Sequence, residues 1–456
     1  MEHKRVAEMS AEEKVEYMTT EPIPRLVSQM AVPTIISMLV TSFYNMVDTM
    51  FVGRLNTQST AAVGVVFSVM AMIQAMGFFF GHGSGNYISR KLGSQEFEDA
   101  KKMAATGFFS AFFVGVVFGV VGIIFLRPLS LMLGSTKTIL PYTMSYLRII
   151  LAGTPFMMSS LVINNQLRFQ GCASSAMYGI IIGAVLNIIL DPLLIFVCDM
   201  GVAGAALATV ISQIVSFSIL LWISMHGGNF RISFKNFTPT WYYLYGIFQG
   251  GVPSLCRQGL GSIATICLNT AAGNFGGAYA DAAIAAMGIV SRVSMFANSA
   301  LIGLGQGFQP VCGTNYGAGK YGRVKEAFSF CVKVAFCVLV VISAAGFLGA
   351  ETVVHIFRED VDVVRIGKLA LRLQCIVFPL NAWIVMSNMM LQTIGESLKA
   401  SILAAARQGL FFLPLIFLLP QFFGLLGVQM CQTVSDICTM TLSVPISLSV
   451  LKRLKS

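Results

Sequence analysis

The sequence predicts an all-α membrane protein with twelve transmembrane helices in two pseudo-symmetric six-helix lobes. Hydrophobic residues make up 56% of the 456 residues and charged residues 11%, and the mean hydropathy is +0.77. This composition excludes a soluble domain and indicates repeated membrane spans. About twelve apolar stretches are each long enough to cross a hydrocarbon core of ~30 Å as a helix. The third observation is an internal repeat, in which features of the first half recur in the same order and at a nearly constant offset in the second half.

The repeat relates the two halves of the chain. Pro33–Gly53 and Pro253–Gly273 carry proline and glycine at matching places, and Ala62–Val66 corresponds to Ala286–Val290. Two related hydrophobic halves are a known plan of secondary transporters, in which two bundles move against each other around a site between them. Single residues also repeat, all at one offset: Gly81 and Gly83 match Gly305 and Gly307, and Arg148, Pro155 and Gly171 match Arg372, Pro379 and Gly395.

Each half contains six predicted spans. The first half has them at residues 26–52, 60–86, 102–126, 141–167, 176–197 and 202–225. The second half has them at residues 241–272, 282–312, 326–349, 363–391, 400–419 and 425–450. The first and seventh stretches are long, which predicts tilt or bending. The predicted organisation is a cytoplasmic N-terminal tail (1–25), an N-lobe (26–225), a linker (226–240), a C-lobe (241–450) and a cytoplasmic C-terminal tail (451–456).

The distribution of basic residues predicts the orientation in the membrane. Of the 30 Lys and Arg residues, 18 fall in segments that are cytoplasmic if both termini are, and six fall in the opposite loops. Cytoplasmic loops of membrane proteins are enriched in Lys and Arg. We therefore expect a multi-pass membrane protein with both termini in the cytoplasm. This bias accounts for the net charge of +10 without a nucleic-acid partner.

Other kinds of site are not indicated. The ten cysteines lack the paired spacing of a disulfide framework or a zinc site. The glycine-rich loop Asn315–Lys325 contains Lys320, but no strand precedes it, and Tyr321 stands where a phosphate loop needs Ser or Thr. We expect a monomer that is not an enzyme, has no cofactor and takes no metal except a coupling Na⁺. Its expected partners are small-molecule substrates and the lipid bilayer.

Carboxylates inside the apolar stretches are the sharpest functional signal. A charged side chain in hydrocarbon is costly, so it normally faces a cavity and has a function there. Asp48 in the first span follows Asn45 by three residues, so the two side chains lie on the same face of the helix. Asn187 and Asp191 in the fifth span are four residues apart and share a face in the same way.

Two further residues add oxygen atoms to this group. Pro192 removes a helical hydrogen bond and frees the carbonyl of Ile188, close to Asp191. Thr209 in the sixth span adds a hydroxyl. Carboxylate, amide and hydroxyl oxygens together suit a proton or a hard cation such as Na⁺. The alternative is a static polar network that only fixes helix packing.

Four motifs are distributed over both halves. They are N-x-x-D-x-x-F-V-G at Asn45–Gly53, N-x-x-x-D-P at Asn187–Pro192, G-A-A-L-A-T at Gly204–Thr209 and N-Y-G-A-G at Asn315–Gly319. Together they resemble the multidrug and toxic compound extrusion (MATE) family, most closely its DinF-like bacterial branch. The resemblance implies a V-shaped cavity between the lobes, efflux driven by H⁺ or Na⁺, and a location in the cytoplasmic membrane of a bacterium. It also implies an N-lobe ion site at Asp48, Asn187, Asp191 and Thr209.

The C-lobe departs from the NorM-like branch of that family. That branch has carboxylates in its seventh and tenth helices, whereas Arg257 and Gln258 occupy the seventh stretch here, and Asn381 and Asn388 the tenth. The sequence thus argues against a cation site in the C-lobe.

Buried positive charge distinguishes the C-lobe and has two interpretations. The arginines either pair with Asp436, Gln306 or carbonyls and fix helix positions, or they line the cavity and bind anionic groups of a substrate or lipid. An arginine keeps its proton, so either role requires partners or water. The candidate cavity residues are Arg257, Gln258, Arg292, Gln306 and Arg407.

These features predict a secondary antiporter that exports amphipathic, often cationic, drugs or metabolites in exchange for H⁺ or Na⁺ by alternating access. The alternative within the same superfamily is a lipid-linked precursor flippase, whose pyrophosphate would bind the cavity arginines. Such flippases usually have more spans than the twelve predicted here. A membrane enzyme is disfavoured because no catalytic cluster is present, and a channel because two lobes suggest rocking.

Overall fold

The computed structural model describes residues 9–226 and 230–454 as an almost entirely helical chain. The long helices of the first half are α2 (Ile23–Gly53), α3 (Thr57–Gly93), α4 (Phe97–Ile124), α6 (Leu140–Phe169), α7 (Ala173–Pro192) and α8 (Gly201–Met225). Those of the second half are α9 (Trp241–Phe275), α10 (Ala280–Gly317), α11 (Tyr321–Leu348), α13 (Val361–Val377) with α14 (Asn381–Ile394), α15 (Ser397–Ala405) with α16 (Phe412–Phe423), and α17 (Leu425–Arg453). Three short helices accompany them, α1 (Ala11–Thr20), α5 (Leu126–Met132) and α12 (Ala350–Phe357).

The predicted fold class is confirmed. Within the described residues, eleven helical segments are long and apolar enough to cross a membrane. Helix α9 is not among these eleven, since polar residues that include Arg257 and Gln258 near its middle make it less apolar. It is 35 residues long, which is enough to cross the membrane as the twelfth span. The predicted spans agree with these helices to within seven residues at each end, and the largest difference is at the end of α3. The linker and C-terminal tail fall partly on residues 227–229 and 455–456, outside the described part of the chain.

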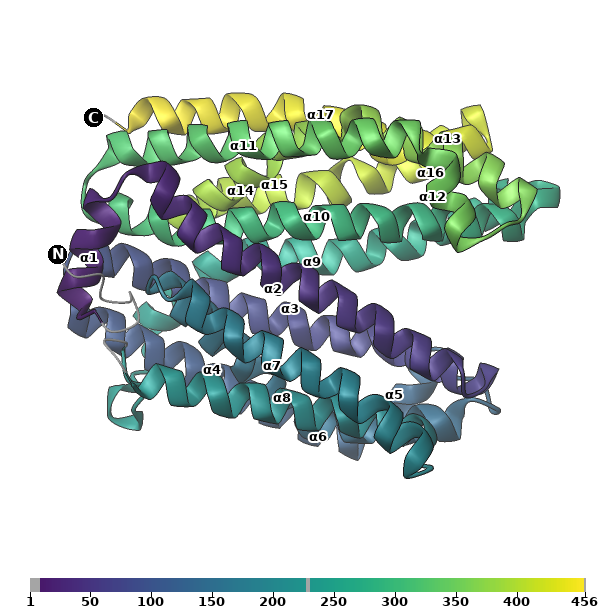
Figure 1. The fold of residues 1–456 in the computed structure, drawn as a ribbon, viewed down its shortest axis with the longest axis horizontal. Coiled ribbons are helices and arrows are strands. Elements are labelled where there is room, and N and C mark those ends of the chain that lie inside the picture. The colour runs from purple at the N-terminus through teal and green to yellow at the C-terminus, as the bar shows by residue number, and fades with distance from the viewer. Residues whose placement is uncertain (1–8, 227–229, 455–456) are drawn as a thin grey trace.

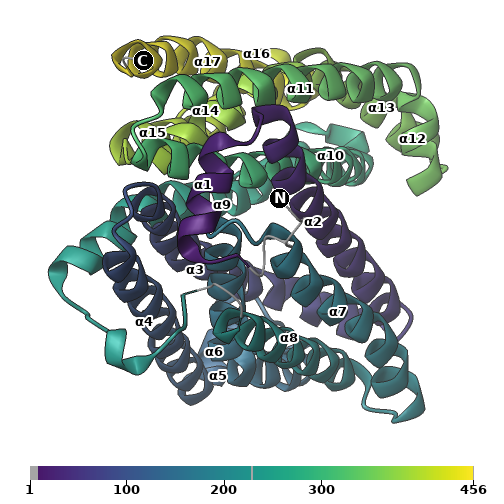
Figure 2. The same cartoon turned by 60° about the vertical axis from the view of Figure 1, so that its left-hand side comes forward.

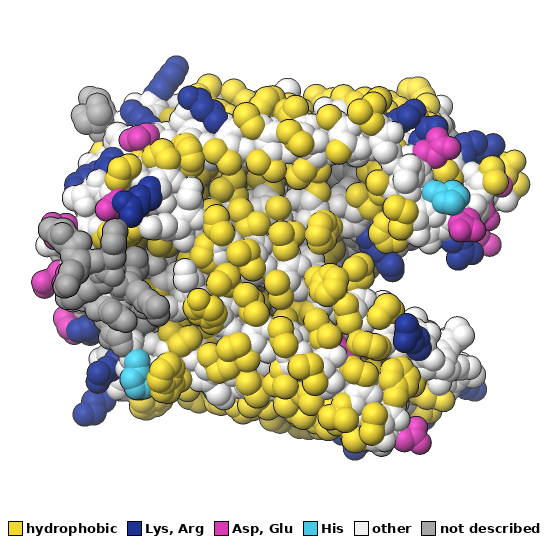
Figure 3. All heavy atoms as spheres, in the orientation of Figure 1, with side chains coloured by type: hydrophobic (Ala, Val, Ile, Leu, Met, Phe, Trp, Pro, Cys, Tyr) yellow, Lys and Arg dark blue, Asp and Glu magenta, His cyan; other side chains and the backbone are white. Residues whose placement is uncertain are grey.

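The helices form two lobes. Figure 1 shows α2 to α8 on one side and α9 to α17 on the other, with the N and C labels at the same end of the molecule. We call this end the closed end. At the opposite, open end a notch separates the lobes, and hydrophobic side chains cover the broad middle while charged ones gather at both ends (Figure 3). This distribution is that of a protein whose long helices cross a bilayer.

The two lobes meet through equivalent helices. Helix α3 packs on α9, and α10 packs on α2. A Cβ on Gly83 of α3 would lie 2.3 Å from the carbonyl oxygen of Ile247 on α9, and one on Gly307 of α10 would lie 2.4 Å from the Cα of Ala31 on α2. Gly83 and Gly307 are matched positions of the sequence repeat. Both inter-lobe contacts therefore depend on a glycine that lets two backbones touch.

Hydrogen bonds inside the lobes follow the same repeat. Asn164 Nδ2 donates to the carbonyl oxygen of Ala176 at 2.9 Å, and Asn388 Nδ2 donates to that of Ala400 at 2.6 Å. The two donors, and likewise the two acceptors, are separated by the same offset as Gly83 and Gly307. The sequence repeat is thus a repeat of structure.

Helix α1 lies across the junction of the lobes at the closed end (Figure 2). Asn315 Nδ2, near the end of α10, donates to the carbonyl oxygen of Met18 at 3.0 Å, and Lys320 Nζ, just after the N-Y-G-A-G motif, donates to that of Thr19 at 3.0 Å. These carbonyls are the unpaired ones at the end of a helix, which donors and cations satisfy. The N-terminal segment is therefore a docked helix from Ala11 onward, while residues 1–8 lie outside the described part.

Candidate functional site

Two carboxylates from different helices meet inside the N-lobe. Asp48 lies on α2 and Asp191 on α7, and these helices pack together. Asp191 is fully buried, whereas Asp48 is half-buried with its Oδ1 inside. The two carboxyl groups lie close enough for their charges to interact directly. Two negative charges so close repel strongly in a low dielectric, which favours a proton or a cation between them.

The site has more acceptors than donors. Asn187, one turn before Asp191, is 2% exposed, and its Nδ2 donates to Asp191 Oδ1 at 3.4 Å. Among the described residues, Asp48 Oδ1, Asn187 Oδ1 and Asp191 Oδ2 are buried without a hydrogen-bond partner. Buried unsatisfied acceptors are costly, and a proton on a carboxylate or a bound cation relieves that cost. We call Asp48, Asn187 and Asp191 the acceptor cluster.

The backbone around the cluster departs from a regular α-helix. Pro192 ends α7, and the chain continues as a π-helical turn at Leu193–Val197. Proline removes one helical hydrogen bond, and such wider turns frequently occur at functional sites. Thr209 on α8 is 5% exposed and donates its hydroxyl to the carbonyl of Ala205 at 3.1 Å. The Thr209 oxygen therefore still has lone pairs to offer.

Two tyrosines that the sequence interpretation missed line the same site. Tyr44 and Tyr146 lie close enough to Asp48 and Asp191 to interact with their charges. Tyr44 precedes Asp48 by four residues, so helical spacing could have identified it, whereas Tyr146 comes from α6 and is placed only by the folded lobe. Asn45 is half-buried on α2, and its side chain has no hydrogen bond to another described residue.

A site for a transition metal is not indicated in the described part of the chain, where no three His, Cys, Asp or Glu side chains gather in a way that could hold a metal ion. The acceptor cluster offers two carboxylates and an amide oxygen instead. Such a donor set fits a proton or a small hard cation.

In the C-lobe, Asp436 is held by three donors. Arg407 Nε lies 2.8 Å from Asp436 Oδ1, which also accepts from Gln432 Nε2 at 2.8 Å. Asn381 Nδ2 donates to Asp436 Oδ2 at 3.2 Å. Arg407 is thus placed as in the first of its two interpretations, in an ion pair between helices. Asp436 is satisfied by protein groups, unlike the acceptor cluster of the N-lobe.

Arg257 and Gln258 lie one turn beyond the inter-lobe contact of α9. Ser254, on the same face as Arg257, is fully buried where α9 meets the N-lobe. Arg257 is half-buried, and its Nη1 donates to Asn388 Oδ1 at 3.2 Å. Gln258 is half-buried too, and its side chain has no hydrogen bond within the described residues.

Arg292 lies beyond a second inter-lobe contact, on α10. It is exposed and shares a helix face with Ser299, whose hydroxyl lies 2.8 Å from that of Ser42 in the N-lobe. Arg292 lies two turns nearer the open end than this inter-lobe contact, and it has no ion pair with another described residue. The C-lobe therefore places two arginines, Arg257 and Arg292, just beyond the surfaces where the lobes touch.

A buried polar cluster joins the lobes nearer the closed end. Arg168 at the end of α6 is 1% exposed and donates to Gln306 Oε1 of α10 and to Asn165 Oδ1. Its Nη2 lies 3.3 Å from His82 Nε2 on α3, and His82 Nδ1 lies 2.8 Å from Ser254 Oγ on α9. We call His82, Asn165, Arg168, Ser254 and Gln306 the inter-lobe polar cluster. Gln306, a predicted cavity residue, is thus part of this contact.

The sequence interpretation missed the inter-lobe polar cluster, because Arg168 follows the predicted span 141–167 and so falls in a loop, and nothing in the sequence near His82 indicates a partner for it. The repeat contains a signal for it. His82 corresponds to Gln306, and Arg168 to Gln392, at the offset that relates Gly83 to Gly307. Because an arginine N–H can only donate, His82 Nε2 accepts, and its proton is therefore on Nδ1 and is donated to Ser254. This arrangement uses the neutral form of the histidine.

Comparisons with known proteins agree with this architecture. The family model described as MatE matches residues 33–193 and 259–418, once in each half. The multidrug export protein MepA of Staphylococcus aureus (strain MSSA476) is 27% identical over 419 residues, which cover 91% of this chain and 92% of the relative. MepA of Staphylococcus haemolyticus (strain JCSC1435) is 28% identical over 419 residues, 91% of each chain.

Two solved structures show the same fold over the whole chain. The outward-facing conformation of a multidrug resistance MATE family transporter of the MOP superfamily superposes with a TM-score of 0.89 and 25% identity, covering 100% of this chain and 99% of that one. A MOP superfamily transporter from Pyrococcus furiosus superposes with a TM-score of 0.90 and 26% identity, covering 97% and 99%. Its binding pocket is described as having reverse polarity, suggesting a different function.

Proposed function

This chain belongs to the multidrug and toxic compound extrusion (MATE) family of multi-pass membrane transporters, and from that premise we propose that it exports amphipathic, often cationic, drugs or metabolites in exchange for H⁺ or Na⁺. The observation that carries the proposal is the acceptor cluster. Three buried oxygens of Asp48, Asn187 and Asp191 lack donors, so this site gains stability when a proton or cation arrives. The multidrug export proteins of two staphylococci, similar over nine-tenths of the chain, support the substrate class.

Coupling follows from the charge of the cluster. An ion drives a conformational change only if it binds one arrangement of the lobes better than the other. Without an ion, Asp48 and Asp191 repel each other and favour an arrangement in which water or a cationic substrate reaches them. With an ion bound, the cluster is closer to neutral and tolerates burial. Ion and substrate therefore occupy the N-lobe alternately.

The inter-lobe polar cluster is the contact that alternating access must break. With both termini in the cytoplasm of a bacterium, the open end faces outside and the arrangement is outward-open. Export then requires separation of Arg168 from Gln306 and of His82 from Ser254 at the closed end. All four side chains are buried, so each separation exchanges a protein hydrogen bond for one to water, which is nearly balanced in free energy.

The deciding experiment is efflux from proteoliposomes. The purified protein is reconstituted as a monomer without any added organic cofactor, and a pH gradient and a Na⁺ gradient are imposed separately. Export driven by one of them supports the proposal and identifies the ion. Export that needs neither gradient, with intact vesicles, contradicts it.

A second candidate substrate class is favoured by one observation. Arg257 and Arg292 lie beyond the inter-lobe contacts, on the C-lobe wall, and neither is paired with a carboxylate in the described part of the chain. A substrate with an anionic group, including the pyrophosphate of a lipid-linked precursor, would suit them. Competition by a lipid-linked sugar for substrate binding would favour this flippase alternative.

A further inference from the structure

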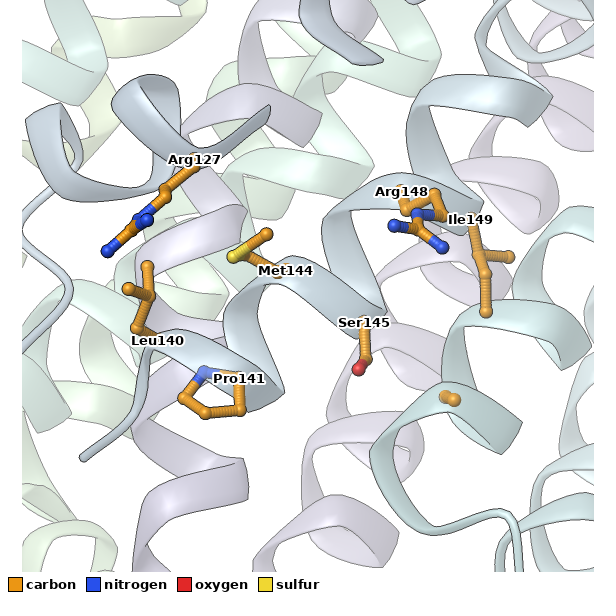
Figure 4. Close-up of a pocket in the computed structure, with 8 residues that line it drawn as sticks. Arg127, Leu140, Pro141, Met144, Ser145, Arg148 and Ile149 are labelled. Atoms are coloured by element: carbon orange, nitrogen blue, oxygen red, sulfur yellow. The ribbon is translucent and has the colours of Figure 1, made fainter. Parts of the chain in front are cut away.

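A recess on the outer side of the N-lobe collects two arginines that the transport proposal does not use. It has a volume of about 650 Å³ and lies where α5, α6 and the start of α8 meet. Figure 4 shows Arg127 and Arg148 at opposite ends of the recess, with Met144 between them. Leu140 and Ile149 add apolar surface. The recess therefore combines two fixed positive charges with an apolar floor.

Arg148 faces away from the interior of its lobe. Tyr146 and Leu147 on the same helix are fully buried, whereas Ser145 and Arg148 are exposed. Arg148 is the ninth residue of α6, so it lies roughly 12 Å along the helix from its first residue. An exposed arginine two turns inside a membrane-spanning helix is costly unless an anion or water meets its guanidinium.

Neither arginine finds that anion in the protein. Arg127 and Arg148 have no hydrogen bond or ion pair with another residue in the described ranges 9–226 and 230–454. Both lie at the open end, because α5 and the start of α6 are found there in Figure 1.

The equivalent place in the C-lobe is neutralised by its own residues. The offset of the repeat that carries Arg148 to Arg372 also carries Arg127 to Glu351 and Met144 to Lys368. Glu351 and Lys368 form an ion pair, with Oε2 and Nζ 2.5 Å apart. The comparison shows that the fold itself does not require an unpaired charge here.

Arg372 also has partners that Arg148 lacks. Its Nε donates to the carbonyl oxygen of Phe347 at 3.2 Å, and its guanidinium lies 5.3 Å from the centre of the Phe347 ring. One lobe thus satisfies the repeated arginine position internally, and the other leaves it exposed together with Arg127.

We propose that this recess binds the phosphate-bearing headgroup of an anionic phospholipid, with Arg127 and Arg148 as donors and Leu140, Met144 and Ile149 beneath the glycerol and acyl part. Arginine pairs well with phosphate because its planar guanidinium offers several donors. We take the bilayer and not free phosphate as the source, because the floor of the recess is apolar and free phosphate would gain nothing from apolar surface. The site is independent of substrate transport.

The test measures the unfolding midpoint of the detergent-solubilised protein during titration with phosphatidylglycerol. A ligand that binds the folded state raises the midpoint, and the titration yields an apparent affinity. Phosphatidylcholine and inorganic phosphate serve as separate arms. We expect stabilisation by phosphatidylglycerol alone. Equal stabilisation by phosphatidylcholine overturns the charge selectivity, and equal stabilisation by inorganic phosphate overturns the lipid as the source.

Variants locate the effect. Arg148→Gln should weaken the apparent affinity for phosphatidylglycerol about fivefold and Arg127→Gln/Arg148→Gln about 25-fold, from ~1 kcal/mol per basic residue near an anionic surface. Arg127→Glu, which copies the acidic residue of the C-lobe, should abolish the effect. The matched control is Arg372→Gln, which should leave the affinity unchanged. Wild-type affinity in both the double variant and Arg127→Glu, or a loss in Arg372→Gln as large as in Arg148→Gln, overturns the proposal.

Discussion

At the scale of single residues, the two N-lobe aspartates and Asp436 are in opposite chemical situations. Asp48 and Asp191 have buried oxygens without donors, whereas Asp436 accepts from Arg407, Gln432 and Asn381. The unpaired oxygens of Asp48 and Asp191 favour the binding of an ion, whereas the paired carboxylate of Asp436 fixes the positions of the helices around it. Conservative substitutions should separate these two roles.

Asp48→Asn and Asp191→Asn should each abolish ion-driven efflux while the protein remains inserted and folded. Asparagine is nearly the same size and can hydrogen-bond, but it cannot take up and release a proton and is a weaker cation ligand. Removing one of two repelling charges should leave the unfolding midpoint near that of the wild type. Efflux under an imposed gradient and thermal unfolding measure the two effects. Wild-type rates in both variants would exclude this pair as the coupling site.

Asp436→Asn is the matched control and should give the reverse result. It leaves the Arg407 guanidinium without its carboxylate in a partly buried position, which typically costs about 3–5 kcal/mol of stability. We expect a lower unfolding midpoint, with ion-driven efflux retained per folded molecule. Loss of coupling at wild-type stability would place a second ion site in the C-lobe.

The C-lobe arginines should differ from one another. Arg407→Gln removes the partner of buried Asp436 and should lower stability by a similar amount. Arg257→Gln replaces a side chain with only one hydrogen bond to protein, to Asn388, and should cost less. Substrate selectivity should be unchanged in both if these residues fix helix positions. Selective loss of anionic substrates in folded Arg257→Gln, measured by a transport panel, would instead favour substrate binding.

At the scale of helices, hydrophobic length and intramembrane charge were sufficient to predict the twelve spans and the residues of the acceptor cluster. Long apolar runs leave few alternatives to a spanning helix. The short helices α5 and α12 were not predicted, because each continues almost directly from the span before it. Arg168 was assigned to a loop, because its burial depends on Gln306, which is 138 residues away in the sequence.

The end of α6 provides a prediction about the contact between lobes. Arg168→Gln should weaken the inter-lobe polar cluster, because the shorter side chain cannot reach Gln306 and His82 together. The population with a separated closed end should therefore increase. Distances between spin labels at the exposed positions Glu98 and Glu326, one in each lobe, measure this population. Arg148→Gln, on the same helix but facing outward, is the control. An unchanged distance distribution in Arg168→Gln would show that this cluster does not hold the lobes together.

At the scale of the whole molecule, the repeat explains how one sequence can support two arrangements. Equivalent glycines, Gly83 and Gly307, make equivalent close contacts on α9 and α2. The two halves differ in their charged residues. The N-lobe has the two carboxylates of the acceptor cluster, and the C-lobe has Arg257 and Arg292 just beyond the inter-lobe contacts. The symmetric part supplies the surfaces that move against each other, and the asymmetric part supplies the chemistry.

The orientation of the molecule is tested by cysteine labelling. Gln58 and Lys137 are exposed at the open end. Single cysteines are introduced there into a variant in which the exposed native Cys198 and Cys337 have been replaced. With 18 basic residues on the side of the termini against six on the other, the open end should face outside. Cysteines at Gln58 and Lys137 should therefore react in intact cells with a membrane-impermeant thiol reagent.

Cysteines at Glu98 and Arg323, at the closed end, should react only after the membrane is permeabilised. Arg323 also donates to Asn315 and to the carbonyl of Glu21, so the exposed Glu326 is a second closed-end position that does not disturb α1. Labelling at both ends in permeabilised cells shows that the sites are accessible and that the variants are folded. The reverse pattern in intact cells would turn the open end toward the cytoplasm. The arrangement would then be inward-open, and the inter-lobe polar cluster would close the path to the outside.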